Sequence, residues 1–448
     1  MNAATKVMWS ATAALALAAL FLLLRNSAAI PSLVALDHNE GWNAAHTIAL
    51  MAGHPLYPAS LMVNNYPPLS FYAVAALATL TGDAVIAGRL LSLLSFLAAC
   101  CLIATITRRL GAGLPGRAAA MVFFAAVLLI ASDYVGMNDP QLLAHALQLA
   151  GLLLLLRGQS LAAAALFAVS LFVKHNLLAL PLASALWLWR QDRLSALRFA
   201  GITGGLLVLE LLLFRLTYGV SLLSVVASPR LISRDNIVFA VSHLWWAVLP
   251  LAGLIWRRHS KKDFCLIYAG AALLSGLVFS AGDGVDTNAF FHFAIACALI
   301  LGLTMEQTVL PSVLSAAALL VFLFFNFHNN NFFYTSAIAA QSARDIAFLR
   351  SHPGPALCDQ ISLCLWAGKR AELDPFNIGE QIKTGVRNPA ALVEMIAAHH
   401  FAVIQLQVQD MLGPEVQTAI AKHYRLDHSD DNGAFFTPLF KALALTEP

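Results

Sequence analysis

Two carboxylates stand close together near the N-terminus of the chain. Asp37 and Glu40 follow the first apolar segment three positions apart, so they share one face if this stretch is helical. A carboxylate held at membrane depth, or just above it, is costly and usually has a function there. Such an acid could act as a general base. The alternative interpretation is a solvated loop acid or a helix cap.

A third acid, Asp139, comes directly before Pro140 at the start of another apolar segment. Asp before Pro is a good helix N-cap, which explains this residue without any catalysis. Capping and catalysis are compatible, however, and the topology argued below puts Asp37, Glu40 and Asp139 on the same outer face. We therefore keep all three as candidate catalytic residues.

A lysine lies where no polar loop would accommodate it. Lys174, followed by His175, stands between two apolar runs. An ammonium at membrane depth needs a partner. It could form a purely structural ion pair with Asp37 or Asp139, or it could contact a phosphate at the level of the lipid headgroups. The outer location favours the phosphate, so Lys174 and His175 are candidate phosphate-binding residues.

Two arginines in a long outer loop, Arg230 and Arg234, are further candidates for phosphate contact, although an exposed loop arginine is more often merely solvated. We predict no cofactor and assign no metal site, although the sequence does not exclude a requirement for a divalent ion. His38, His46 and His54 are spaced eight and eight apart, which fits no familiar ligand motif, and no Cys/His cluster has zinc spacing.

The composition indicates a membrane protein. Of the 448 residues, 59% are hydrophobic and only 11% are charged, and the mean hydropathy is +0.74. A chain this apolar uses lipid as its solvent, so its backbone must be helical or a closed barrel. The apolar runs are continuous and rich in Leu and Ala, which favours helices. The net charge of +3 comes from scattered basic residues, which argues against nucleic acid as a partner.

The apolar runs predict about eleven membrane spans. They cover residues 7–24, 86–106, 118–132, 141–156, 160–173, 177–189, 199–216, 238–256, 264–280, 289–304 and 308–326. A further apolar segment, 69–81, is only 13 residues long and reads as a helix lying in the membrane interface. With 69–81 so placed, most basic loop residues fall on one side, which predicts a cytoplasmic N-terminus and an outer C-terminal tail.

From about residue 328 the composition changes, and charged residues become frequent. We therefore divide the chain into a transmembrane domain, 1–327, with an outer loop at 25–85, and an extracytoplasmic α/β domain, 328–448. Residues 356–358 and 402–406 look like short buried strands, and 389–399 looks like a helix. Cys358 and Cys364 either pair in an oxidising compartment or are two separate buried thiols.

Several short motifs, in this order, resemble those of the GT-C superfamily of membrane glycosyltransferases. The similarity is to its bacterial dolichyl-phosphate-mannose-transferase-like and aminoarabinose-transferase-like branch. The motifs are the early Asp-x-x-Glu, Gly53-His54-Pro55-Leu56-Tyr57-Pro58, Tyr66-Pro67-Pro68-Leu69-Ser70-Phe71-Tyr72, Gly88-Arg89-Leu90-Leu91-Ser92, Asn138-Asp139-Pro140-Gln141, Val173-Lys174-His175-Asn176, Leu365-Trp366-Ala367-Gly368-Lys369 and Leu373-Asp374-Pro375-Phe376. One departure is that aminoarabinose transferases carry a Glu-Lys pair just before the double proline, where this chain has Asn64-Asn65-Tyr66.

The resemblance implies juxtamembrane helices in the first outer loop, a polyprenyl-phosphate sugar donor and an inverting transfer. Asp37 matches the first-loop catalytic acid of the family, Asp139 matches its second acid, and Lys174 loosely matches a position near the donor phosphate. We expect a hexosyl- or pentosyltransferase on the outer face of a bacterial inner membrane. Its acceptor would be an envelope glycan, a lipid or a protein. The alternatives are a transporter or flippase, and a non-catalytic scaffold for envelope assembly.

Overall fold

A computed structural model describes residues 3–58, 60–256, 262–305, 308–326, 336–408 and 410–439 of the chain. The chain divides into two compact units. Unit 1 comprises Met1–Pro31, Tyr66–Val226 and Ile232–Tyr334, and unit 2 comprises Ser32–Asn65, Ala227–Leu231 and Thr335–Pro448. Each unit is described by itself below.

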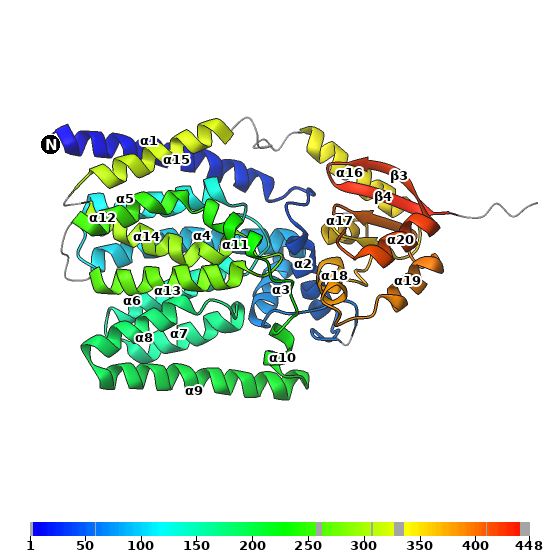
Figure 1. Ribbon diagram of the computed structural model, residues 1–448, viewed down its shortest axis with the longest axis horizontal. Helices are drawn as coiled ribbons and strands as arrows, with labels where there is room; N and C mark the ends of the chain where they lie inside the picture. Colours follow the sequence, from blue (N-terminus) through cyan, green and yellow to red (C-terminus); the bar gives the residue numbers. More distant parts are fainter. Residues whose placement is uncertain are drawn as a thin grey trace, which may run out of the picture. The chain divides into compact units, whose positions relative to one another are not determined.

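Unit 1 is built from helices. They are α1 (Ala3–Ala29), α3 (Leu69–Thr81), α4 (Ala84–Arg109), α5 (Leu114–Ala131), α6 (Gln141–Leu155), α7 (Ser160–Val173), α8 (Ala179–Gln191), α9 (Arg193–Tyr218), α10 (Leu222–Val226), α11 (Arg234–Ser242), η1 (Trp245–Ala247), α12 (Val248–Trp256), α13 (Lys262–Ser280), η2 (Thr287–Phe290), α14 (Phe291–Thr304) and α15 (Leu310–Asn326). Most of them run roughly alongside one another (Figure 1).

The described part of the chain holds six helices that are long and apolar enough to cross a membrane, or seven if one bent pair counts as a single span. Four shorter apolar helices, of 10–17 residues, accompany them. The α-helical membrane class is therefore confirmed, together with a helix at nearly every predicted span. The count of eleven crossings, and the interfacial position of α3, stay predictions.

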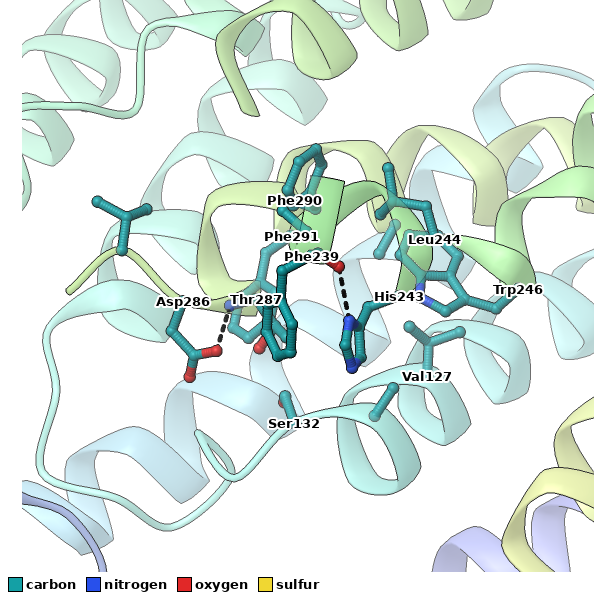
Figure 2. Close-up of a pocket in the computed structure, with 14 residues that line it drawn as sticks. Val127, Ser132, Phe239, His243, Leu244, Trp246, Asp286, Thr287, Phe290 and Phe291 are labelled. Atoms are coloured by element: carbon teal, nitrogen blue, oxygen red, sulfur yellow. Dashed lines mark hydrogen bonds between the residues drawn. The ribbon is translucent and has the colours of Figure 1, made fainter. Parts of the chain in front are cut away.

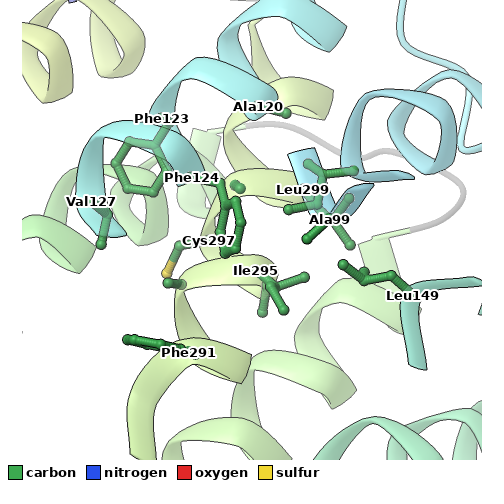
Figure 3. Packing of buried hydrophobic residues seen from close by; sticks show 14 of the residues in the cluster. Ala99, Ala120, Phe123, Phe124, Val127, Leu149, Phe291, Ile295, Cys297 and Leu299 are labelled. Atoms are coloured by element: carbon green, nitrogen blue, oxygen red, sulfur yellow. The ribbon is translucent and has the colours of Figure 1, made fainter. Parts of the chain in front are cut away.

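A tightly packed apolar core joins the helices of unit 1. Phe123, Phe124 and Val127 of α5 lie among Phe291 and Ile295 of α14 (Figure 3), and all five are buried. Other helices show the opposite pattern: only 17% of the most apolar stretch of α9 and 22% of that of α1 are buried. In a protein whose solvent is lipid, such exposed leucine-rich faces need no further partner.

The predicted span 238–256 is wrong as one continuous helix. The chain bends by 48° between the segments Arg234–Ser242 and Trp245–Ala252. The break falls at His243 and Leu244, where α11 has ended and the backbone of Leu244 leaves the α-helical region (φ −88°, ψ 14°). The chain accordingly passes through a turn of 3₁₀ helix, η1, before α12 begins.

Unit 2 is the α/β part of the chain. Its elements are α2 (His38–Met51), α16 (Ser336–Ser351), β1 (Ala356–Cys358), α17 (Ile361–Trp366), α18 (Pro375–Lys383), α19 (Ala390–Ala397), β2 (Val403–Leu406), α20 (Pro414–His423), β3 (Tyr424–Asp430) and β4 (Gly433–Pro438). The strands form one sheet in the order β1-β2-β4-β3, in which β1 and β2 are parallel and the other pairs are antiparallel. The two predicted strands and the predicted helix, α19, are confirmed.

Much of the predicted outer loop, 25–85, belongs to unit 2, whereas the sequence assigned it to the transmembrane domain. The Asp374 N–H donates to the Leu61 carbonyl at 3.0 Å. Gly41 of α2 lies so close to the backbone of Ile361 and Ser362 that a Cβ added there would collide with it. Only glycine allows this approach. The predicted boundary at residues 327 and 328 lies outside the described residues.

Cys358 and Cys364 form a disulfide, so the pairing alternative is confirmed. The bond joins the end of β1 to α17, which lies against α2. Replacing both cysteines by alanine should lower the free energy of unfolding by about 2 kcal/mol, because the open chain regains loop entropy. Denaturant unfolding of the purified full chain, with and without a reductant, measures this loss. If reduction leaves the unfolding midpoint of the unmodified protein unchanged, the disulfide does not stabilise unit 2.

Candidate active site

Asp37 stands at the start of α2 and caps it. Its Oδ1 accepts the Asn39 N–H at 2.8 Å, and the backbone of Asp37 is extended, as an N-cap requires. The side chain is still 36% exposed and lies 3.5 Å from Nδ1 of His38. Asp37 thus fulfils the capping alternative and remains accessible to a substrate.

Glu40 has a different environment. It is completely buried, and its Oε2 accepts the Leu36 N–H at 3.1 Å. This contact fixes the backbone just before α2. In a capping box, the glutamate at the third helical position likewise accepts a backbone N–H from the start of its helix. The geometry favours this structural task for Glu40, and its catalytic role stays a prediction.

Two further acids of unit 2, Asp359 and Asp374, are buried. Asp359 follows β1 directly; its Oδ2 accepts the N–H groups of Gln407 and Val408, at 3.1 and 3.4 Å, while its buried Oδ1 has no hydrogen-bond partner. Asp374 caps α18 through the Asn377 N–H. Burial raises the pKa of both carboxyl groups above the ordinary value.

An aromatic ring connects His38 with one predicted arginine. The imidazole of His38 is tilted against the ring of Phe376 at 5.3 Å, and the Arg230 guanidinium lies 4.7 Å from the centre of the same ring. Sequence reasoning missed Asp359, Asp374 and Phe376 as site residues. The motif Leu373-Asp374-Pro375-Phe376 was a signal for the last two, whereas Asp359 carries none beyond its place after a strand.

In unit 1, Lys174 and Asp139 form a buried ion pair. Nζ of Lys174 lies 3.3 Å from Oδ2 of Asp139 and donates a hydrogen bond to the Tyr66 hydroxyl at 2.8 Å. The side chains of Lys174 and Asp139 are only 3% and 1% exposed. The ammonium also lies 4.0 Å from the centre of the Tyr66 ring. Of the alternatives for Lys174, the structure therefore shows the ion pair with Asp139.

Local structure holds both partners of this pair in place. Lys174 ends α7 as its C-cap. Oδ1 of Asp139 accepts the Gln141 N–H at 2.7 Å and so holds the start of α6, although the N-cap itself is Pro140 and not Asp139 as predicted. The ring of His175 faces Tyr66 edge-on at 6.4 Å. Three residues with separate sequence signals, Tyr66, Asp139 and Lys174, therefore meet.

A polar chain continues from Asp139 into the apolar helices. Nε2 of Gln141 lies 3.0 Å from Nε2 of His145, whose ring stands edge-on to that of His292 at 4.5 Å. The Tyr268 hydroxyl lies 2.8 Å from Nδ1 of His292. All four side chains are buried. Sequence reasoning missed this network, although a histidine inside an apolar run is itself a signal.

The two predicted arginines belong to different compact units. Arg230 belongs to unit 2, whereas Arg234 is an exposed residue at the start of α11 in unit 1. Among the three loop histidines, His46 is buried against Trp42 and lies 3.3 Å from the Val63 carbonyl. Burial lowers the pKa of its imidazole to about 4, so His46 stays neutral near pH 7.

A small apolar pocket opens in unit 1 between α5, α11 and η2. Phe239, His243, Trp246 and Phe290 line it (Figure 2). Nδ1 of His243 lies 2.7 Å from the Phe239 carbonyl, so this imidazole is already engaged. The cavity has a volume of about 40 Å³, which is room for water rather than for a sugar. A wider cleft of about 650 Å³ in unit 2 lies between α2 and the segment 365–372.

The whole chain is similar to two solved structures of one protein. The crystal structure of ArnT from Cupriavidus metallidurans bound to undecaprenyl phosphate has a TM-score of 0.59 and 14% sequence identity, with 100% of each chain covered. The structure of the same protein in the apo state has a TM-score of 0.59 and 14% sequence identity, with 98% of this chain and 99% of that chain covered. No family model matches, and no curated protein matches the sequence. The likeness shows the fold and agrees with the expected resemblance.

The ion pair generates a testable expectation. Lys174→Met should destabilise the protein by about 3–5 kcal/mol, because Asp139 is left as a buried charge without its partner. The double variant Lys174→Met with Asp139→Asn should recover much of that loss, since neither charge remains. Thermal unfolding of the detergent-purified chain compares the two. A double variant as unstable as Lys174→Met would mean that the two charges are not coupled.

Proposed function

We propose that this chain is a glycosyltransferase that moves a sugar from a polyprenyl-phosphate donor to an envelope glycan, lipid or protein on the outer face of a bacterial inner membrane. The observation that carries the proposal is the full-length fold likeness to ArnT, whose solved structure holds undecaprenyl phosphate. The apolar helices of unit 1 provide the surroundings that such a lipid tail requires.

The proposed reaction is a direct displacement with inversion. Asp37 accepts the proton of the acceptor hydroxyl, whose oxygen forms the new bond to the anomeric carbon of the sugar. The bond between that carbon and the phosphate oxygen breaks, and its electron pair leaves with the polyprenyl phosphate. The partial exposure of Asp37 and its place at the start of α2 support this role, since a base must reach its substrate.

Cations are proposed to offset the charge that develops on the leaving phosphate. Lys174 is the first candidate, because a phosphate could replace or share the partner that Asp139 now provides. Arg230, Arg234 and His175 are secondary candidates. Arg230 has the better support of the two arginines, since its stacking on Phe376 holds the guanidinium in a defined direction.

The proposal includes a cytoplasmic N-terminus and an extracytoplasmic unit 2. The disulfide between Cys358 and Cys364 supports it, because such bonds persist mainly in oxidising compartments. The distribution of basic residues over the loops gives the same orientation.

Asp37→Asn tests the base. Asparagine caps a helix about as well as aspartate but cannot take up a proton, so transfer should fall by at least ~10²-fold at normal protein levels. Turnover of lipid-linked sugar in membranes measures it, after mass spectrometry of envelope glycans has identified the product. Asp192→Asn is the matched control, since Asp192 caps α9 in the same way through the Leu194 and Ser195 N–H groups. Full activity of Asp37→Asn would remove the base and favour a transporter or scaffold.

Orientation is tested by cysteine labelling with an impermeant maleimide in intact spheroplasts. The free cysteines, Cys100, Cys101, Cys265 and Cys297, are first replaced by alanine, and the disulfide is kept. Val386→Cys, an exposed position of unit 2, should then react from outside, and Gln191→Cys, the exposed last residue of α8, should react only after lysis. The opposite pattern would overturn the orientation and with it the outer-face reaction.

A further inference from the structure

Three potential metal ligands meet in unit 2, apart from the candidate catalytic residues. Asp345 comes from α16, and His428 and Asp430 come from β3. One ligand atom of each residue lies within 4.8 Å of the other two. Asp345 is 2% exposed, so its carboxylate is held away from bulk water.

The imidazole of His428 is oriented as in a metal ligand. Its Nδ1 lies 3.0 Å from Oδ2 of Asp427, and its Nε2 lies 3.5 Å from Oδ1 of Asp345. The ring is stacked on Phe435 at 4.5 Å with an interplanar angle of 8°. When Nδ1 donates its proton to Asp427, Nε2 keeps its lone pair. A carboxylate behind the imidazole is the usual arrangement for a histidine that binds a metal.

Both carboxylates are also held from behind, through one residue of the β3–β4 turn. Nδ2 of Asn432 donates to Oδ2 of Asp345 at 2.6 Å, and the Asn432 N–H donates to Oδ1 of Asp430 at 2.9 Å. Each acid therefore has one oxygen engaged by Asn432 and one left for the cluster. Outer partners of this kind fix the direction of metal-binding oxygens.

Two carboxylates this close repel each other unless a proton or a cation lies between them. Burial of Asp345 strengthens the repulsion, because little water screens the charges. A divalent cation neutralises both acids together and uses the free Nε2 of His428 as a third ligand. Imidazole nitrogen suits Zn²⁺ and related transition ions, while Ca²⁺ and Mg²⁺ prefer an all-oxygen shell.

We propose that Asp345, His428 and Asp430 bind one divalent transition-metal ion of the Zn²⁺ or Mn²⁺ class, with water completing the shell. The ion fastens α16 to the β3–β4 hairpin, which are about 80 residues apart in sequence. Its task is to stabilise unit 2, and it is independent of the proposed transfer reaction.

The experiment uses the full chain in detergent, stripped with a chelator and then titrated with ZnCl₂ or MnCl₂ alone. Bound metal is counted by elemental analysis, and thermal unfolding is followed in parallel. We expect one ion for each chain and an unfolding temperature that rises with metal concentration. His428→Gln and Asp430→Asn should each weaken binding by at least ~10-fold. Asp431→Asn, a neighbouring exposed residue with the same change of charge, should bind like the unmodified chain.

Asp427→Asn gives a readout that a merely structural role of the cluster would not move. It leaves all three ligands in place but removes the carboxylate behind His428, so the metal affinity should fall by about 10-fold to 100-fold. The proposal is overturned if the unmodified chain binds no ion, or if His428→Gln and Asp430→Asn bind as tightly as Asp431→Asn. Either result would leave a proton shared between Asp345 and Asp430 as the explanation of the cluster. Asp430→Asn keeps the test decisive if His428→Gln does not fold.

Discussion

A lysine ammonium buried among apolar helices must be neutralised where it stands, and the contact between Lys174 and Asp139 meets that requirement in unit 1. Each partner terminates a helix, so the ion pair fixes the end of α7 against the start of α6. Tyr66 completes the arrangement through its hydroxyl and its ring, and it comes directly before the double proline that leads into α3. Desolvation of such a pair is expensive, and this third partner offsets part of that cost.

The packing of unit 2 depends on a close approach between the backbone of α2 and the backbone at the start of α17. Gly41 brings α2 against Ile361 and Ser362, in the loop that the Cys358–Cys364 disulfide closes. This contact connects the helix that carries Asp37 to the end of β1 and thereby to the sheet. A residue that is to act as a base gains from such a support, because a small displacement of the reacting atoms is costly in rate.

The parts of the fold that sequence could predict are those with a strong apolar signal. Helices such as α3 and α7 begin and end at the predicted residues, since the transition from apolar to polar residues is sharp there. The strands β3 and β4 were not predicted. Tyr424–Asp430 is mostly polar and exposed. Its pairing with β4 is therefore determined by tertiary contacts, and the local sequence pattern gives little indication of a strand. The bend before α12 was not predicted, because the largely apolar run 238–256 continues across it.

The candidate site was predictable to a similar degree. A polar residue inside an apolar run, such as Lys174, can be recognised from the sequence alone. Partners whose own surroundings in the sequence look ordinary, such as Asp359, can be recognised only in the folded chain. Residues Ser32–Asn65 of the predicted outer loop were also assigned to the wrong compact unit, because no composition change marks them as belonging with the C-terminal residues.

The environments of the two main acids suggest how their tasks would be divided. Asp139 is 1% exposed and its charge is matched by Lys174, so taking up a proton there would break an ion pair inside an apolar unit. Asp37 is 36% exposed, and its partners are a backbone N–H and the nearby imidazole of His38. A proton can reach Asp37 without the loss of a buried contact. The base in the proposed reaction is therefore better sought at Asp37, while the geometry of Asp139 suits it to holding the Lys174 ammonium in place.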